Sequence, residues 1–137
     1  MQAGAHFVIA GDQNADPNDG GSVRGAARQL TEHPLINNSA TPGSAGGAEQ
    51  AALQGLANTL HKGNPAHDTA DFGDGSEEDF QTAPGNLRVD YVLPSKNLSI
   101  RDCGVFWPET PDPLFALVGV DPFPASDHRL VWVNVCV

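Results

Sequence analysis

The stretch that decides the fold is "HFVIAGDQNADPNDG", residues 6–20, where an apolar run gives way abruptly to acidic and amide side chains. Residues 6–10 are rich in β-formers and end at a Gly-Asp pair, which predicts a buried strand that stops at a polar turn. The turn, residues 11–20, is open to three interpretations: a calcium loop, an active-site loop, or a plain connection. Each interpretation leads to a different class of protein.

The calcium-loop interpretation fails on the spacing of the residues. A helix-loop-helix calcium loop needs alternating oxygen ligands, a glycine at the sixth position and a glutamate at the twelfth. Counting from Asp12, the sixth residue is Pro17, which cannot adopt the positive φ that the turn requires. The twelfth is Val23, which offers no carboxylate. A strand also precedes the loop where the calcium motif would need a helix.

Length and charge narrow the class of protein. The chain has 137 residues, and we treat residues 1–137 as one domain. Lys+Arg 7 against Asp+Glu 17 gives a formal net charge of -10, which argues against a broad basic surface for long nucleic acid. No apolar run approaches the roughly 20 residues that a membrane span needs. The chain shows no signal peptide, and its location stays open, including secretion of a longer parent protein.

Periodicity predicts two helices and a long loop in the first part of the chain. Residues 22–33 carry apolar side chains at helical spacing, and Pro34 follows the end. Residues 47–63 form the clearest helix, with a glycine at the end as a natural stop. Its expected buried face consists of Leu53, Leu56, Ala57 and Leu60. Residues 64–85 are acidic and poor in aromatics, and we expect a long, solvated loop that is functional or mobile.

The second part of the chain is mostly strand. Residues 86–93, 102–107 and 128–137 are β-rich runs, and residues 114–120 could form a strand or a short helix. Mixed helices and strands indicate an α/β or α+β architecture. We expect the tryptophans, Trp107 and Trp132, to lie in the core.

The two cysteines, Cys103 and Cys136, have no metal-type spacing. Buried free thiols are the preferred interpretation, and a disulfide stays open.

Polar side chains stand at the ends of three predicted strands. Asp12 and Asn14 follow the first strand, Asp90 lies within the run LRVDYVL, and Asp127 and His128 precede the last strand. Strand ends are where α/β sheets build their sites. An aspartate inside an apolar strand is costly to bury without a partner. A histidine is the natural partner, because a carboxylate that accepts from Nδ1 fixes the tautomer and leaves Nε2 for the substrate.

Each of these residues also has a purely structural interpretation. Asp12 and Asn14 could form a polar turn, and Asp90 could pair with Arg88 or Arg101. Asp127 and His128 could simply flank a strand, with the histidine at the surface. A separate cluster, His67, Asp68 and Asp71, offers an alternative metal site.

The runs "GDQNADP", "LRVDYVLPS" and "SDHRLVWV" together resemble successive motifs of the endonuclease/exonuclease/phosphatase superfamily, the deoxyribonuclease-like metal-dependent phosphoesterases. All three occur in the family's order and span almost the whole chain. The resemblance implies half of a four-layer α/β sandwich, with one mainly antiparallel or mixed sheet and two to three helices.

The resemblance also implies a role for each polar residue. Asp12 would lie by the attacking water and the metal, and Asn14 would hydrogen-bond the scissile phosphate. Asp127 would be a metal-site carboxylate, so the implied metal ligands are Asp12 and Asp127. His128 would act at the phosphoryl group as a base or transition-state stabiliser, with Asp90 as its orienting partner. Oxygen ligands without thiolates favour Mg²⁺ or Mn²⁺ over Ca²⁺.

One departure from the family pattern affects the expected assembly. The family draws further catalytic groups, an Asn, a Glu and a His, from an N-terminal half that does not precede His6 here. We therefore expect a C-terminal half whose apolar sheet face lacks its usual cover. Such a face predicts self-association, with a second copy in place of the missing layer.

Three functions follow from these patterns. The first is a metal-dependent hydrolase of a small phosphoester, or a fragment of one. The second is a non-catalytic remnant that keeps the fold without turnover. The third is a hydrolase of carboxylic esters, although no G-x-S-x-G elbow is present.

Overall fold

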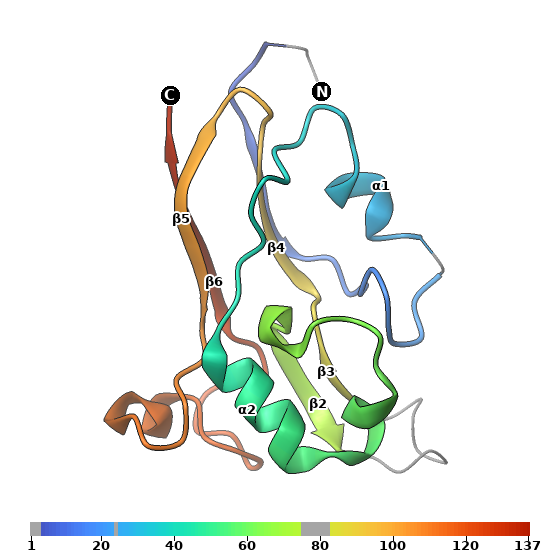
Figure 1. The fold of residues 1–137 in the computed structure, drawn as a ribbon, viewed down its shortest axis with the longest axis vertical. Coiled ribbons are helices and arrows are strands. Elements are labelled where there is room, and N and C mark those ends of the chain that lie inside the picture. Colours follow the sequence, from blue (N-terminus) through green and yellow to red (C-terminus); the bar gives the residue numbers. More distant parts are fainter. Residues whose placement is uncertain (1–3, 24, 75–82) are drawn as a thin grey trace.

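The computed structural model describes residues 4–23, 25–74 and 83–137 (Figure 1). The strands are β1 (Val8–Asp12), β2 (Ala70–Asp74), β3 (Pro84–Leu87), β4 (Asp90–Pro94), β5 (Ser99–Phe106) and β6 (Leu130–Cys136). The α-helices are α1 (Arg28–Thr31) and α2 (Ala45–Gln54), and short 3₁₀ helices are η1 (Leu56–Leu60), η2 (Pro65–His67) and η4 (Pro113–Leu117). Among these described residues, no helix is long and apolar enough to cross a membrane.

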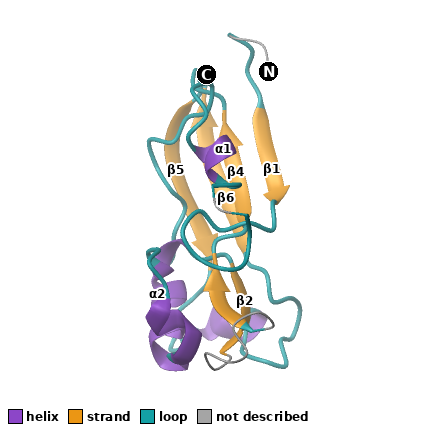
Figure 2. Cartoon of the chain, turned by 90° about the vertical axis from the view of Figure 1, so that its right-hand side faces the viewer, coloured by secondary structure: helices purple, strands orange, loops and turns teal. Residues whose placement is uncertain are grey.

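The mixed α/β class is confirmed, and the strands pair in three antiparallel two-stranded sheets rather than in the one sheet that we expected. The pairs are β1–β4, β2–β3 and β5–β6. Prolines at the start of β3 and the end of β4 lack the N–H that a longer ladder needs, and a register shift interrupts β5. β4 nevertheless lies beside β6, so that two of the pairs run side by side along the molecule (Figures 1 and 2).

The first predicted helix, residues 22–33, is wrong in length. The structure forms only the four-residue α1, and the chain before it turns at Gly25, which has a φ of 82°. A residue in this left-handed region cannot continue a right-handed helix. Ala27, just before α1, is buried against the core that lies under β1 and β4.

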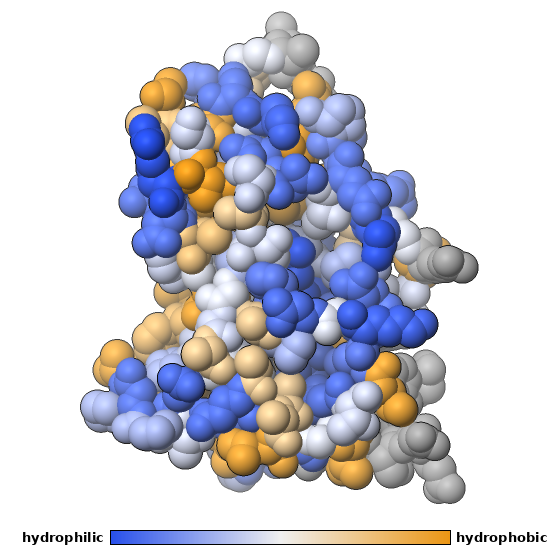
Figure 3. Space-filling model, in the orientation of Figure 1, coloured by the Kyte–Doolittle hydropathy of each residue, from blue (hydrophilic) through white to orange (hydrophobic). Residues whose placement is uncertain are grey.

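The second predicted helix ends early, and its predicted buried face is wrong for the three leucines and confirmed only for Ala57, which is fully buried. α2 stops at Gln54 because Gly55 and Leu56 both have positive φ, and the chain continues as the 3₁₀ helix η1. The leucines of the predicted face are exposed, at 68% for Leu53, 54% for Leu56 and 50% for Leu60. The residues of α2 that are buried are Gly46, Gly47, Gln50 and Ala51. Apolar side chains accordingly gather at the end of the molecule where α2 lies (Figure 3).

The buried face of α2 is set by its glycines rather than by its leucines. A Cβ at Gly46 would lie 2.1 Å from the carbonyl oxygen of Trp107 and 2.5 Å from that of Pro108. Only a residue without a side chain allows this close approach to the end of β5. Ser44 begins the helix, because its hydroxyl accepts a hydrogen bond from the Gly47 amide at 3.1 Å.

The segment 64–85, which we expected to be one long loop, contains η2, β2 and the start of β3. Ala70 of this segment forms a small buried cluster with Leu87 and Val89, which follow it, and Phe72 packs against the cluster. The segment therefore contributes to an apolar core, which its acidic composition did not predict. Residues 75–82, which belong to the acidic segment that we expected to be a solvated loop, lie outside the described residues.

Two further apolar clusters complete the core. One joins Ile36, Tyr91 and Leu93 under β1 and β4, and the other joins Val105, Trp107 and Val118 beside β5. Trp107 is buried as expected. The expectation for Trp132 is wrong: it is 40% exposed, because it stands on the outer face of β6 opposite Gly104. Residues 113–117 take the short-helix alternative.

Both cysteines, Cys103 and Cys136, are free and half-buried.

Candidate active site

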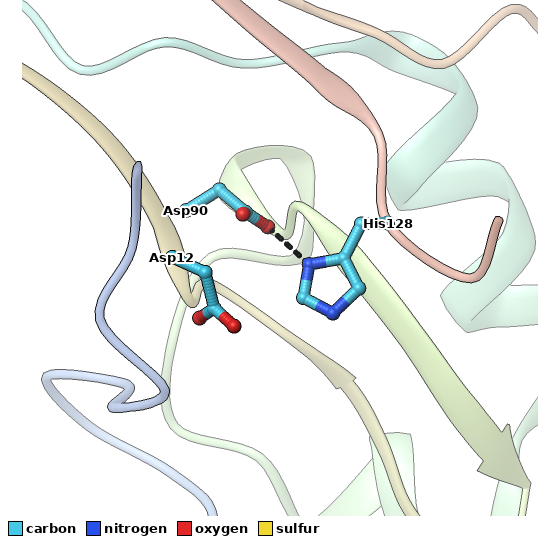
Figure 4. Close-up of side chains that lie close together, drawn as sticks. All are labelled: Asp12, Asp90 and His128. Atoms are coloured by element: carbon cyan, nitrogen blue, oxygen red, sulfur yellow. Dashed lines mark hydrogen bonds and ion pairs between the residues drawn. The ribbon is translucent and has the colours of Figure 1, made fainter. Parts of the chain in front are cut away.

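Three of the predicted site residues converge at one place (Figure 4). Asp12 ends β1, Asp90 begins β4, and His128 lies just before β6. One ligand atom from each residue lies within 4.8 Å of those of the other two. In the part of the chain that the structure describes, this is the one group of three or more acidic, histidine or cysteine side chains that is so close.

Strand pairing brings the two carboxylates together. Asp12 and Asp90 are direct partners in the antiparallel ladder of β1 and β4. Side chains of directly opposed residues lie on the same face of a sheet, so both carboxylates project to one side. The site therefore depends on the register of this ladder, because a slip of one residue would turn one carboxylate to the opposite face.

The chain before β6 delivers the histidine. His128 forms an isolated β-bridge with Ala70, and the Arg129 amide donates to the Thr69 carbonyl at 2.7 Å. Arg129 is itself buried, and its guanidinium lies 4.4 Å from the ring centre of Trp107 and 5.0 Å from that of Phe123. These contacts fix the backbone on both sides of the imidazole.

The imidazole of His128 is held by Asp90. Its Nδ1 lies 2.8 Å from Asp90 Oδ2, and the Phe72 ring meets it edge-on with ring centroids 5.5 Å apart. Because an ionised carboxylate only accepts, Nδ1 carries the proton, and in the neutral imidazole Nε2 keeps its lone pair. Arg88 lies over the Tyr91 ring instead, at 4.8 Å from the centroid. Asp90 thus has His128 as its partner, and the ion pair with Arg88 does not form.

The carboxylates of the loop after β1 hydrogen-bond to backbone amides, both in the loop itself and at Arg88. The Asp12 carboxylate accepts from the Asn14 amide at 2.6 Å, and Asn14 adopts a φ of 48°. Asp16, which we interpreted only as part of the turn, is buried and accepts from the amide of Arg88 at 2.8 Å and from two amides of its own loop. This carboxylate therefore ties the loop to the chain just before β4.

The hydroxyl of Tyr91 also contacts this loop. Its hydroxyl lies 2.7 Å from the carbonyl oxygen of Ala15 and 2.8 Å from that of Arg88. Burial raises the pKa of the Tyr91 phenol, so the group stays protonated and serves as a donor. The tyrosine and Asp16 together hold Asp12 and Asn14 in place.

Asn14 and Asp127 lie at the edge of this centre. Asn14 lines a cavity of about 420 Å³, whose wall also includes Phe72 and Leu87. Asp127 lines a different cavity of about 540 Å³, together with Asp71. Successive side chains on an extended chain point in opposite directions, which separates Asp127 from the group that its neighbour His128 joins.

The alternative metal cluster does not form in the described part of the chain. His67 Nδ1 lies 2.9 Å from the carbonyl oxygen of Pro42, and Asp71 accepts from Gln54 Nε2 at 2.6 Å. Asp68 is buried near other acids: burial, and then the charges of Asp16 and Asp19, raise its pKa to about 8.

One residue of this region escaped the sequence prediction. The Thr69 hydroxyl lies 3.0 Å from Asp90 Oδ2, directly behind the Asp90–His128 pair. Nothing in the sequence pointed to it, because it lay in the predicted loop 64–85, 21 residues from its partner. A threonine in such a segment has no signal of its own.

The fold and the site define a mixed α/β protein with a carboxylate–histidine centre built at strand ends. A family model described as "Endonuclease/Exonuclease/phosphatase family" matches residues 2–128. The chain belongs to this family, as the three sequence motifs predicted. No curated protein and no solved structure matches the chain.

Proposed function

We propose that the chain is a metal-dependent hydrolase of phosphoesters. The observation that carries the proposal is the convergence of Asp12, Asp90 and His128 within 4.8 Å. Family membership supports the reaction class, and the geometry supports the location of its centre.

The donor set of this centre fits a divalent cation. The oxygen donors of this centre are the carboxylates of Asp12 and Asp90, and the centre holds no thiolate, which suits Mg²⁺ or Mn²⁺. Asp12 is exposed, so a cation and its waters can reach the carboxylate. When bound, such a cation would offset the negative charge of the phosphoryl group. Asp127, implied as a ligand by the family resemblance, stays a prediction, because its side chain lines the neighbouring cavity.

Each side chain has a distinct part in this proposal. His128 presents Nε2 to the phosphoryl group, as a base toward water when the imidazole is neutral with its proton on Nδ1, or as a donor to the developing charge once Nε2 is protonated as well. Asp90 holds the imidazole in the tautomer that this requires. Asn14 borders the cavity beside the centre and would donate to a phosphate oxygen.

The substrate in this proposal is a small phosphoester. The net charge of -10 disfavours long nucleic acid, whose binding depends on neutralising many phosphates. The walls of the cavity at Asn14 contain no lysine or arginine among the described residues. Its apolar part, Phe72, Leu87 and Val89, suits an organic leaving group rather than a polyanion.

The test is hydrolysis of bis(p-nitrophenyl) phosphate and p-nitrophenyl phosphate with Mg²⁺, Mn²⁺, Ca²⁺ or chelator. His128→Ala is expected to lower kcat by about 10²- to 10⁴-fold. His6→Ala is the matched control, because His6 is exposed and lies outside the centre. Equal activity in both variants would overturn the proposal.

Two further measurements separate the other two functions. Binding of Mn²⁺ by calorimetry without any turnover would identify a non-catalytic remnant. Hydrolysis of p-nitrophenyl acetate that survives chelator would identify a carboxylic ester hydrolase.

We also propose that two copies associate through the outer face of β6. Leu130 is 68% exposed and Trp132 is 40% exposed on alternate positions of this strand, which places both side chains on one face. Apolar side chains of this size in one row favour burial against a partner. A second copy of the chain is the partner that we expect.

A further inference from the structure

Thr69 lies where three segments of the chain meet. Its amide donates to the Leu87 carbonyl at the end of β3, at 2.9 Å. Its carbonyl accepts from the Arg129 amide, next to His128, at 2.7 Å. The residue is only 1% exposed. The backbone of Thr69 thus joins the chain that carries Asp90 to the chain that carries His128.

The hydroxyl of Thr69 has only one direction in which to donate. It accepts from the Val89 amide at 3.0 Å and from the Asp90 amide at 2.9 Å. These two donors occupy the acceptor side of the oxygen, which leaves its single proton for Asp90 Oδ2 at 3.0 Å. The orientation of this hydrogen bond is therefore fixed by the backbone of β4 itself.

The same carboxylate oxygen receives the histidine. Asp90 Oδ2 lies 2.8 Å from His128 Nδ1 and 3.0 Å from Thr69 Oγ1. Without the threonine, the carboxylate could rotate about its side-chain bonds and still meet the imidazole at several angles. With the threonine, the Asp90 oxygen that faces the imidazole also accepts a hydrogen bond from a buried hydroxyl, which restricts this rotation.

We propose that Thr69 is a positioning residue for phosphoester hydrolysis, which acts by fixing the Asp90 carboxylate and through it the tautomer and angle of His128. This role rests on the proposed function of the centre. Catalytic groups need placement to within about 0.5 Å and 10–20°. Loss of a supporting partner one shell behind such groups typically lowers activity by about 10- to 100-fold.

A second buried hydroxyl provides a matched control. Ser95 follows β4 at its other end, is 1% exposed, accepts from the Phe7 amide at 3.2 Å and donates to Asn97 Oδ1 at 2.7 Å. Like the Thr69 hydroxyl it is buried and hydrogen-bonded, but its hydrogen-bond partners lie outside the centre. Ser95→Ala therefore reports what the loss of a buried hydroxyl does by destabilisation alone.

The first arm of the experiment measures kcat, KM and the free energy of unfolding with bis(p-nitrophenyl) phosphate and Mn²⁺. Thr69→Val keeps the shape and removes the hydroxyl, and it is expected to lower kcat about 10- to 100-fold with KM nearly unchanged. Thr69→Ser keeps the hydroxyl and should retain kcat near the wild-type value. Ser95→Ala should lose stability and keep kcat.

The second arm does not need activity. Nitrogen-15 NMR of the neutral imidazole should show one tautomer of His128, protonated at Nδ1, in the wild type, in Thr69→Ser and in Ser95→Ala. Thr69→Val should show a mixture of tautomers. Thr69→Ala replaces it if the valine variant does not fold.

The two arms distinguish the possible failures. An inactive wild type would remove the proposed function, and the tautomer comparison would still decide the role of Thr69. A wild-type tautomer and wild-type kcat in Thr69→Val, or equal losses in Thr69→Ser and Thr69→Val, would overturn the positioning role.

Discussion

Asp68 shows how burial changes the chemistry of a single carboxyl group. The side chain is buried, and the nearby charges of Asp16 and Asp19 add to the effect of burial. Its pKa is about 8, against 3.8 as the ordinary value, so it is protonated in the folded protein at neutral pH. The unfolded chain releases this proton above about pH 4.

The sign of the pH effect follows from these two pKa values. Between about pH 4 and pH 8 the folded state binds more protons at Asp68 than the unfolded state, so this group lowers stability as the pH rises. The slope is at most about 1.4 kcal/mol per pH unit. Above about pH 8 the effect is constant.

Asp68→Asn is expected to remove this dependence. The free energy of unfolding of the variant minus that of the wild type should rise steadily from pH 5 to pH 8, as measured by urea unfolding. Glu109→Gln is the control, because Glu109 is exposed and should show no such trend. A constant difference between Asp68→Asn and wild type across this range would contradict the assigned pKa.

Single residues also show what the sequence could predict of the site. Asp12 and His128 were predictable because they are polar residues at the ends of apolar runs, and Asp90 because it is an aspartate inside one. Asp16 and Thr69 were not, because their importance lies in backbone amides contributed by distant segments. Such partners become visible only when the chain is folded.

At the level of elements, α2 belongs to the helix that periodicity predicted most clearly, and the packing predicted for its leucines is wrong. The apolar spacing of Leu53 and Leu56 indicated a buried face, yet both side chains are exposed. The helix packs instead through Gly46, where the backbone of Trp107 and Pro108 comes too close for any side chain. Periodicity reports apolar side chains, and a contact made by a glycine has none to report.

Gly46→Ala tests this packing. Alanine favours a helix by about 1 kcal/mol over glycine, but its Cβ would lie 2.1 Å from the Trp107 carbonyl oxygen. We expect a net loss of about 1–3 kcal/mol in the free energy of unfolding, by urea titration.

Ala52→Gly is the matched control for propensity alone. Ala52 is exposed in the same helix and should lose only about 1 kcal/mol. A Gly46→Ala variant more stable than the wild type would show that α2 does not pack closely against the end of β5.

At the level of the whole molecule, the outer face of β6 bears on assembly. The sequence predicted an apolar sheet face open to a partner, and Leu130 is 68% exposed on this strand. Leu53 has the same exposure of 68% on α2, far from β6 in the chain. The two leucines allow the role of the face to be separated from that of exposed apolar surface in general.

Light scattering after gel filtration measures the association. The wild type should show a dimer whose population rises with concentration. Leu130→Lys should weaken the dimer at least about tenfold, since burying an unpaired charge costs well over 1 kcal/mol. Leu53→Lys should leave it unchanged, and equal effects of the two changes would contradict an interface at β6.

For the whole molecule, the sequence predicted the family but not the pairing of the strands. The order of the three motifs predicted the family, which the match over residues 2–128 confirms. The division of the strands into three pairs was not predictable, because the pairing of β1 with β4 joins segments that lie far apart in the sequence. The position of Asp127, which lines a neighbouring cavity and not the Asp12–Asp90–His128 centre, likewise depends on the folded path of the chain before β6.

The central claim is that Asp12, Asp90 and His128 form a cation-dependent phosphoesterase centre. It is tested most directly by the rate of bis(p-nitrophenyl) phosphate hydrolysis as a function of Mn²⁺ concentration, in the wild type and in Asp12→Asn. The wild-type rate should rise with Mn²⁺ to a plateau and fall to background in chelator, and Asp12→Asn should need at least about tenfold more Mn²⁺. Hydrolysis that persists in chelator, or an identical Mn²⁺ dependence in Asp12→Asn, would contradict the claim.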